Sequence, residues 1–177
     1  GAAGISVNRG TDWIIEGNYI GTTSDGASPV PNGVGVGLNM TDYSIIKGNI
    51  ISGNRGAGIH LLNITDYITI EGNTIGLAAD GQTGMGNGDS SDFWTPGILV
   101  LLSGSYGRIS GNYIASNEVA GIALITTGEG WVIENNYIGT TTNGATARPN
   151  VWGIVFAGPN SVIRGNLISG HGQTNQV

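Results

Sequence analysis

The sequence predicts an all-β solenoid, a single domain of about six coils. A tetrad of the form Gly-Asn-x-Ile, or a near copy of it, recurs six times in 177 residues. The asparagines of the six tetrads are Asn18, Asn49, Asn73, Asn112, Asn136 and Asn166. A motif that returns every few dozen residues is typical of a repeat protein, in which each unit buries its apolar face against the next.

Each coil is expected to hold two short strands. The first has the pattern Gly-φ-x-φ, and the second contains an isoleucine three residues before the tetrad asparagine. Aligning the coils gives four columns of large apolar residues. They are Ile5, Val36, Ile59, Ile98, Ile122 and Ile154; Val7, Leu38, Leu61, Val100, Leu124 and Phe156; Ile15, Ile46, Ile70, Ile109, Ile133 and Ile163; and Ile20, Ile51, Ile75, Ile114, Ile138 and Ile168. Apolar residues two apart, mostly β-branched, favour strands with one buried face.

The spacing inside each coil is nearly constant, whereas the return to the next coil varies between 8 and 23 residues. Long returns follow the first, third and fifth tetrads, and each carries Asp-Gly or Asn-Gly, a strong turn signal. We expect these returns to form loops that project from alternate coils as a row about 9–10 Å apart, given the spacing of strands.

The four columns and the tetrads resemble those of the right-handed parallel β-helix, of the pectin-lyase-like kind with degenerate parallel β-helix repeats. The resemblance covers essentially residues 1–177 and implies a bacterial secreted or surface protein. A leucine-rich repeat has a similar period, but it expects leucine columns and a different place for its asparagine. Many proteins with the β-helix fold cleave acidic polysaccharides, so the resemblance also raises an enzymatic hypothesis.

Composition argues against several classes of protein. The formal net charge is -6 and no basic cluster occurs, which argues against nucleic-acid binding. There is no cysteine, so disulfides and thiolate metal sites are impossible, and we expect neither a metal nor a cofactor. No apolar run is long enough to insert in a membrane. No signal peptide opens the chain, which we interpret as an open-ended mature piece, either an excerpt of a longer extracellular protein or a stacking subunit.

Two polar columns accompany the apolar ones. The tetrad asparagines should stack at one turn and hydrogen-bond along the solenoid axis as a structural ladder. The residue before each tetrad should face outward, and no two neighbours in this column share a charge: Glu16, Lys47, Glu71, Ser110, Glu134 and Arg164. We interpret the column as a charge-balanced wall, because like charges on adjacent strands would oppose the stacking. Glu16, Lys47 and Glu71 are weak catalytic candidates, since two carboxylates near 10 Å apart approach the separation in inverting glycosidases.

Aromatic residues supply the ligand-binding candidates. Tyr113 and Tyr137 should point outward on neighbouring coils, where they stack on each other or on a sugar ring. Phe93, Trp94 and Trp152 lie near the ends of two long returns, where they cover the flank of the solenoid or form an exposed contact surface. Five other aromatics begin the second strand, and corner stacking is the expectation for them: Trp13, Tyr43, Tyr67, Tyr106 and Trp131.

Three functions stay open. The favoured one is an extracellular structural β-solenoid, a surface or filament scaffold that self-associates through its ends, because open strand edges recruit further strands. The second is a carbohydrate-binding module that contacts glycans. The third is a polysaccharide lyase or glycoside hydrolase acting on acidic glycans. Asp89 and Asp92 are the only close acid pair, and His60 and His171 are isolated, so the sequence favours a role other than catalysis.

Overall fold

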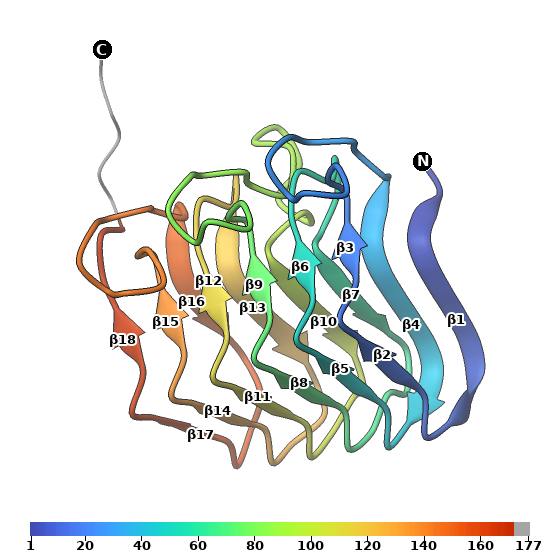
Figure 1. Ribbon diagram of the computed structural model, residues 1–177. Coiled ribbons are helices and arrows are strands. Elements are labelled where there is room, and N and C mark those ends of the chain that lie inside the picture. The colour runs from blue at the N-terminus through green and yellow to red at the C-terminus, as the bar shows by residue number, and fades with distance from the viewer. Residues whose placement is uncertain (172–177) are drawn as a thin grey trace.

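A computed structural model describes residues 1–171 and shows a solenoid of about six coils built from three parallel sheets (Figure 1). Each coil gives one strand to each sheet, and every pairing between neighbouring coils is parallel. The described residues contain no helix. The expected all-β solenoid is therefore confirmed.

The three sheets each contain six strands. The first sheet consists of β1 (Ala3–Thr11), β4 (Val34–Asp42), β7 (Ile59–Leu62), β10 (Ile98–Leu102), β13 (Ala120–Thr126) and β16 (Trp152–Phe156). The second consists of β2 (Ile14–Glu16), β5 (Ile45–Lys47), β8 (Thr69–Glu71), β11 (Arg108–Ser110), β14 (Val132–Glu134) and β17 (Val162–Arg164). The third consists of β3 (Tyr19–Ile20), β6 (Ile50–Ile51), β9 (Thr74–Ile75), β12 (Tyr113–Ile114), β15 (Tyr137–Ile138) and β18 (Leu167–Ile168).

The coil has three strands where the sequence predicted two, because the tetrad bends the chain between the second and third sheets. The first residue of every tetrad has a positive φ, which explains the recurrent glycine. The fifth tetrad has Asn135 here instead, with φ 56°, and asparagine is among the residues that best tolerate this left-handed region. The bend places the tetrad isoleucine on a third, two-residue strand.

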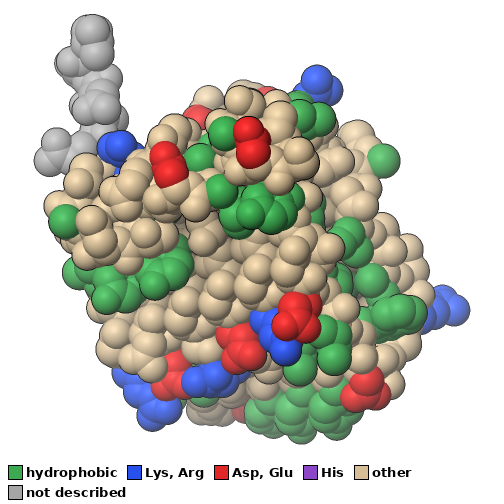
Figure 2. All heavy atoms as spheres, viewed as in Figure 1, with side chains coloured by type: hydrophobic (Ala, Val, Ile, Leu, Met, Phe, Trp, Pro, Cys, Tyr) green, Lys and Arg blue, Asp and Glu red, His purple; other side chains and the backbone are tan. Residues whose placement is uncertain are grey.

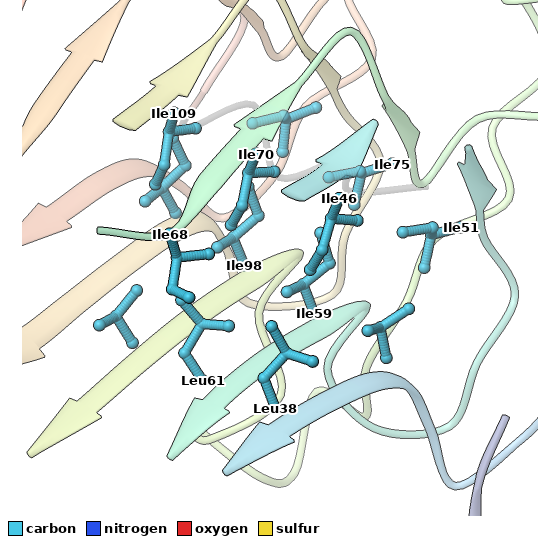
Figure 3. Close-up of a cluster of buried hydrophobic side chains, with 14 of the residues drawn as sticks. Leu38, Ile46, Ile51, Ile59, Leu61, Ile68, Ile70, Ile75, Ile98 and Ile109 are labelled. Atoms are coloured by element: carbon cyan, nitrogen blue, oxygen red, sulfur yellow. The ribbon is translucent and has the colours of Figure 1, made fainter. Parts of the chain in front are cut away.

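The four predicted apolar columns form the core (Figure 3). Their members in coils two to five are fully buried, as Ile46 on β5 and Ile70 on β8 illustrate. Strand registers pair the column members directly, for example Ile46 with Ile70. Stacking like residues at every coil removes their apolar surface from water, which stabilises the solenoid along its whole length.

The tetrad asparagines form the predicted ladder. Asn49 donates to Asn73 Oδ1 twice, from its backbone N–H at 3.0 Å and from Nδ2 at 2.9 Å. Its Nδ2 also donates to the Ile15 carbonyl at 2.9 Å. The same pattern continues to Asn112, Asn136 and Asn166. The asparagines are therefore structural, since their hydrogen-bonding groups are used within the turn.

A second ladder, which the sequence analysis missed, lies where each return meets the first sheet. It is built by Asn32, Asn54, Asn87, Asn117 and Asn150. The first four each donate Nδ2 to the Oδ1 of the next asparagine at 2.9–3.0 Å. Four of these asparagines precede the glycine of the first strand by three or four residues, which is a usable signal. The insertion after Asn87 interrupts that spacing and hides the column.

Candidate functional site

The outward column of the second sheet is a row of alternating charges (Figure 2). Lys47 Nζ lies 3.4 Å from Glu16 Oε1 at one end of the row. Ser110 interrupts the row, and Arg108 on the same strand replaces the missing cation by reaching Glu71 at 3.8 Å and Glu134 at 2.7 Å. The structure thus agrees with the interpretation of a charge-balanced wall.

Glu134 is the most constrained carboxylate of this row. Arg164 Nε donates to Oε2 at 2.7 Å, and Arg108 Nε donates to Oε1 at 2.8 Å. The glutamate side chain is only 9% exposed. These hydrogen bonds, from Arg164 first and then Arg108, hold the pKa of Glu134 below its ordinary value of 4.5.

Replacing Glu134 by glutamine should therefore lower stability in a pH-dependent way. A carboxyl group with a depressed pKa in the folded protein contributes stability above its unfolded pKa and loses it as the pH falls through the folded value. We expect Glu134→Gln to unfold at lower urea concentration than wild type at pH 7. The difference between the two proteins should shrink as the pH falls below 4.5. Urea titrations between pH 7 and pH 3 measure it, and a difference independent of pH would contradict the expectation.

The three weak catalytic candidates lie together on this wall. Glu16, Lys47 and Glu71 are consecutive in the column and border a shallow hollow of about 490 Å³ with Gly48, Gly72 and Arg108. Glu16 is paired with Lys47, and Glu71 is paired with Arg108. Each carboxylate already has a cationic neighbour, so the arrangement serves electrostatic balance, and a catalytic role stays a prediction.

The long returns of coils one, three and five form a row at one edge of the solenoid, at the top of Figure 1. Each is a small hairpin closed by an isolated antiparallel bridge, for example Thr22 with Pro29. The loops touch one another directly, since the Ala79 N–H donates to the Gly26 carbonyl at 3.0 Å and the Thr142 N–H to the Gly81 carbonyl at 3.1 Å. The three loops thus form one continuous surface that spans the short returns, here called the loop ridge. The sequence had suggested three separate loops.

Phe93, Trp94 and Trp152 form an aromatic cluster at the end of the coil-three return. The Phe93 ring centroid lies 5.9 Å from that of Trp94 and 5.4 Å from that of Trp152, in edge-to-face arrangements. Exposed fractions of 43%, 49% and 47% leave about half of each side chain in water. Exposed aromatics in contact mark candidate interaction surfaces. This cluster is the most apolar of the predicted ligand-binding groups.

Tyr113 and Tyr137 pair directly on β12 and β15, with ring centroids 5.4 Å apart and planes tilted by 46°. Tyr137 is 37% exposed and Tyr113 is partly buried. The two rings contact each other, as the stacking interpretation expects. Glycan binding by this pair stays a prediction.

The five corner aromatics belong to two adjacent columns. Tyr43, Tyr67 and Tyr106 stack on the surface with centroids 4.8 and 5.3 Å apart, and all three have positive φ. Trp131 lies one residue further along its coil and is fully buried, with its indole N–H donating to the Gly104 carbonyl at 2.7 Å. Aligning the coils by sequence did not separate the two columns, because they lie one residue apart at the same corner.

The acid pair Asp89 and Asp92 is engaged within its own loop. Asp89 accepts from the Ser91 N–H and hydroxyl, and Asp92 accepts from the Trp94 N–H, so the acid pair caps its own loop.

His60 faces outward on β7, and its Nε2 is buried without a partner among the described residues. Burial lowers the pKa of His60. No group of three or more His, Cys, Asp or Glu in residues 1–171 could hold a metal ion. Within the same range, no helix is long and apolar enough to cross a membrane.

The last described coil exposes part of the core. Ile163 and Ile168 are 44% and 45% exposed, whereas the corresponding isoleucines of coils two to five are fully buried. Val162 and Leu167 beside them are 43% and 39% exposed. The strands β17 and β18 have one partner each, β14 and β15, so their other edges are unpaired among residues 1–171. This surface, formed by β16, β17 and β18, is the end face of coil six.

Comparison with known families agrees with this architecture. The family model for the right-handed beta helix region matches residues 1–138. The chain belongs to the right-handed β-helix family. The solenoid is therefore right-handed, which is also the hand that parallel crossover connections favour. No curated protein and no solved structure matched the chain.

Proposed function

We propose that this right-handed β-helix serves as an extracellular structural scaffold, whose ends stack on further coils of the same kind. The exposed core isoleucines of the end face of coil six carry the proposal. A fully buried aliphatic side chain contributes about 1.5–3 kcal/mol relative to an exposed one. Ile163 and Ile168 gain part of this when another coil covers them.

The internal chemistry supports a structural role. Both asparagine ladders use their side chains to hold coils together, and the charge row pairs its carboxylates with Lys47, Arg108 and Arg164. The strands of such repeats pair with those of the neighbouring coils, so added coils extend the same structure. Unpaired strand edges favour such additions.

The test is the assembly state of the 177-residue chain. We expect concentration-dependent association in light scattering coupled to size exclusion, and elongated particles in negative-stain micrographs. The double variant Ile163→Lys/Ile168→Lys should shift the population to monomers, because two charges on the joint would have to be desolvated. A wild-type protein that stays a monodisperse monomer at about 100 µM, well above the Kd of an 8 kcal/mol interaction, would contradict the proposal.

The control variant is Ile64→Lys, which places the same change at an isoleucine that is 56% exposed and lies between β7 and β8. It should associate as wild type does. Circular dichroism of all variants distinguishes loss of assembly from loss of folding. Equal loss of association in the control and the end-face variant would contradict the proposal.

Carbohydrate binding is a second candidate, favoured by the aromatic cluster of Phe93, Trp94 and Trp152. Aromatic rings offer apolar faces to the C–H faces of sugars, and Trp94 has the most exposed side chain of the three. A glycan array should give hits that weaken at least tenfold in Trp94→Ala. An array without hits, or hits unchanged in that variant, would remove this candidate.

A further inference from the structure

We infer that the partner of the end face of coil six is coil one of a second copy of this chain, joined head to tail in the register of one continuous solenoid. The inference rests on the proposed function and names the partner and geometry of its joint. Three features of the described residues carry it: the asparagine ladder, the charge row and the loop ridge. The asparagine ladder and the charge row end on coil six, and the loop ridge ends on the return of coil five. In each case the last groups complement those with which the feature begins on coil one.

The asparagine ladder has a direction, which makes its two ends complementary. The asparagines from Asn18 to Asn136 each donate their N–H and Nδ2 to the Oδ1 of the asparagine on the next coil. Among residues 1–171, Asn166 donates Nδ2 to the Ile133 carbonyl, and its N–H has no acceptor. Asn18 Oδ1 receives no donor in the same part of the chain. Stacking coil one on coil six lets Asn166 donate to Asn18 of the second copy.

The charge row is complementary in the same direction. It begins with Glu16, whose side chain is 59% exposed, and ends with Arg164, whose side chain is 66% exposed. The joint places this arginine beside the glutamate, continuing the alternation. A joint between two coil-six end faces, with their second sheets aligned, would place the two Arg164 side chains close together, and like charges on adjacent strands are destabilising. The charges therefore select the head-to-tail orientation.

The loop ridge extends across the joint because the number of coils is even. Long returns alternate with short ones, so coil one of the second copy occupies the place of a seventh coil with a long return. Ala79 and Thr142 donate their N–H groups to the preceding long loop, to Gly26 and Gly81. Ser24 is the equivalent donor on coil one, and the Gly144 carbonyl is the equivalent acceptor. The joint brings these two groups together.

Disulfide trapping tests the register, and the absence of cysteine from the chain removes any background. Leu167 continues the third-sheet column that begins with Tyr19. Across the joint their Cα atoms would be about 4.8 Å apart, within the range for a disulfide. Within one chain five strand spacings, or about 24 Å, separate them, which no disulfide can bridge.

We expect Tyr19→Cys/Leu167→Cys to give a ladder of covalent multimers on non-reducing gels after mild oxidation. A second pair, Ile14→Cys/Val162→Cys, tests the same joint on the second sheet and serves if the first pair folds poorly. The mismatched pair Tyr19→Cys/Val162→Cys is the control and should stay largely monomeric, because its cysteines lie on different sheets.

The outcomes separate this inference from the proposed function. Covalent multimers from both matched pairs, absent from the mismatched pair, support the head-to-tail joint. Association by light scattering without selective cross-linking overturns the joint and leaves the scaffold in place. Efficient dimerisation of Leu167→Cys alone indicates a joint between two coil-six end faces and also overturns the inference. Absence of both association and cross-linking overturns the scaffold together with its joint.

Discussion

Replacing Asn73 by alanine is expected to lower the free energy of unfolding by about 3–5 kcal/mol, through several buried polar groups left without partners at about 1–3 kcal/mol each before relaxation. Asn73 is fully buried in the middle of the ladder. Its Oδ1 accepts two hydrogen bonds from Asn49, and its Nδ2 donates to Asn112 Oδ1 and to the Ile46 carbonyl. Alanine fills none of these roles.

Urea unfolding followed by far-ultraviolet circular dichroism measures this change. The matched control is Asn18→Ala on coil one, where the ladder begins. Asn49 Oδ1 keeps the hydrogen bond from the backbone N–H of residue 18 in that variant, so we expect a loss of less than about 1 kcal/mol. Similar losses at both positions would show that the ladder contributes no more inside the solenoid than at its end. The slope of unfolding against urea should be compared as well, because repeat proteins can lose cooperativity.

The second large effect is expected for Trp131→Ala, which should cost about 3–5 kcal/mol. Trp131 is the largest fully buried side chain. Its ring occupies the space beside Gly107 on the preceding coil, where a Cβ would clash with the ring. Truncation leaves a cavity that neighbouring strands cannot close and removes the hydrogen bond to the Gly104 carbonyl.

Trp13→Ala is the control for this prediction. Trp13 occupies the corresponding position, just before the strand of the second sheet, but it lies on coil one and is 48% exposed. We expect a loss of about 1 kcal/mol or less, because much of its surface is already in contact with water. Thermal or urea unfolding of both variants decides the matter. A larger loss for Trp13→Ala than for Trp131→Ala would contradict the assignment of Trp131 to the core.

Much of the fold followed from local patterns. The isoleucine columns predicted the core because a period of two residues describes a strand with one buried face. The recurrence of Asn49 and its equivalents predicted the ladder, since the polar residue returned at a fixed distance from a core residue. The sequence did not predict the third strand, because the bend that separates it from the second is made by a single glycine with positive φ.

The candidate site depended more on geometry between coils. The sequence placed Glu16, Lys47 and Glu71 in one column, but it gave no indication that Arg108 reaches over Ser110 to two glutamates. A long side chain such as that of Arg108 can reach charged groups outside its own column, and aligning single positions along the chain does not show this. The same reason explains why Trp131 and Tyr106 were grouped together, although one is buried and the other lies on the surface.

By itself, the sequence determined the repeat, the apolar columns and the first asparagine ladder, because stacking identical coils turns each column into a contact between like residues. Only the tertiary structure decided the second ladder, the closed loop ridge and the exposed core of coil six. The second ladder and the loop ridge depend on how returns of different length meet across the coils. Such contacts are set by packing in three dimensions, and the spacing along the chain encodes them only in part, because the insertion after Asn87 hides the second asparagine column.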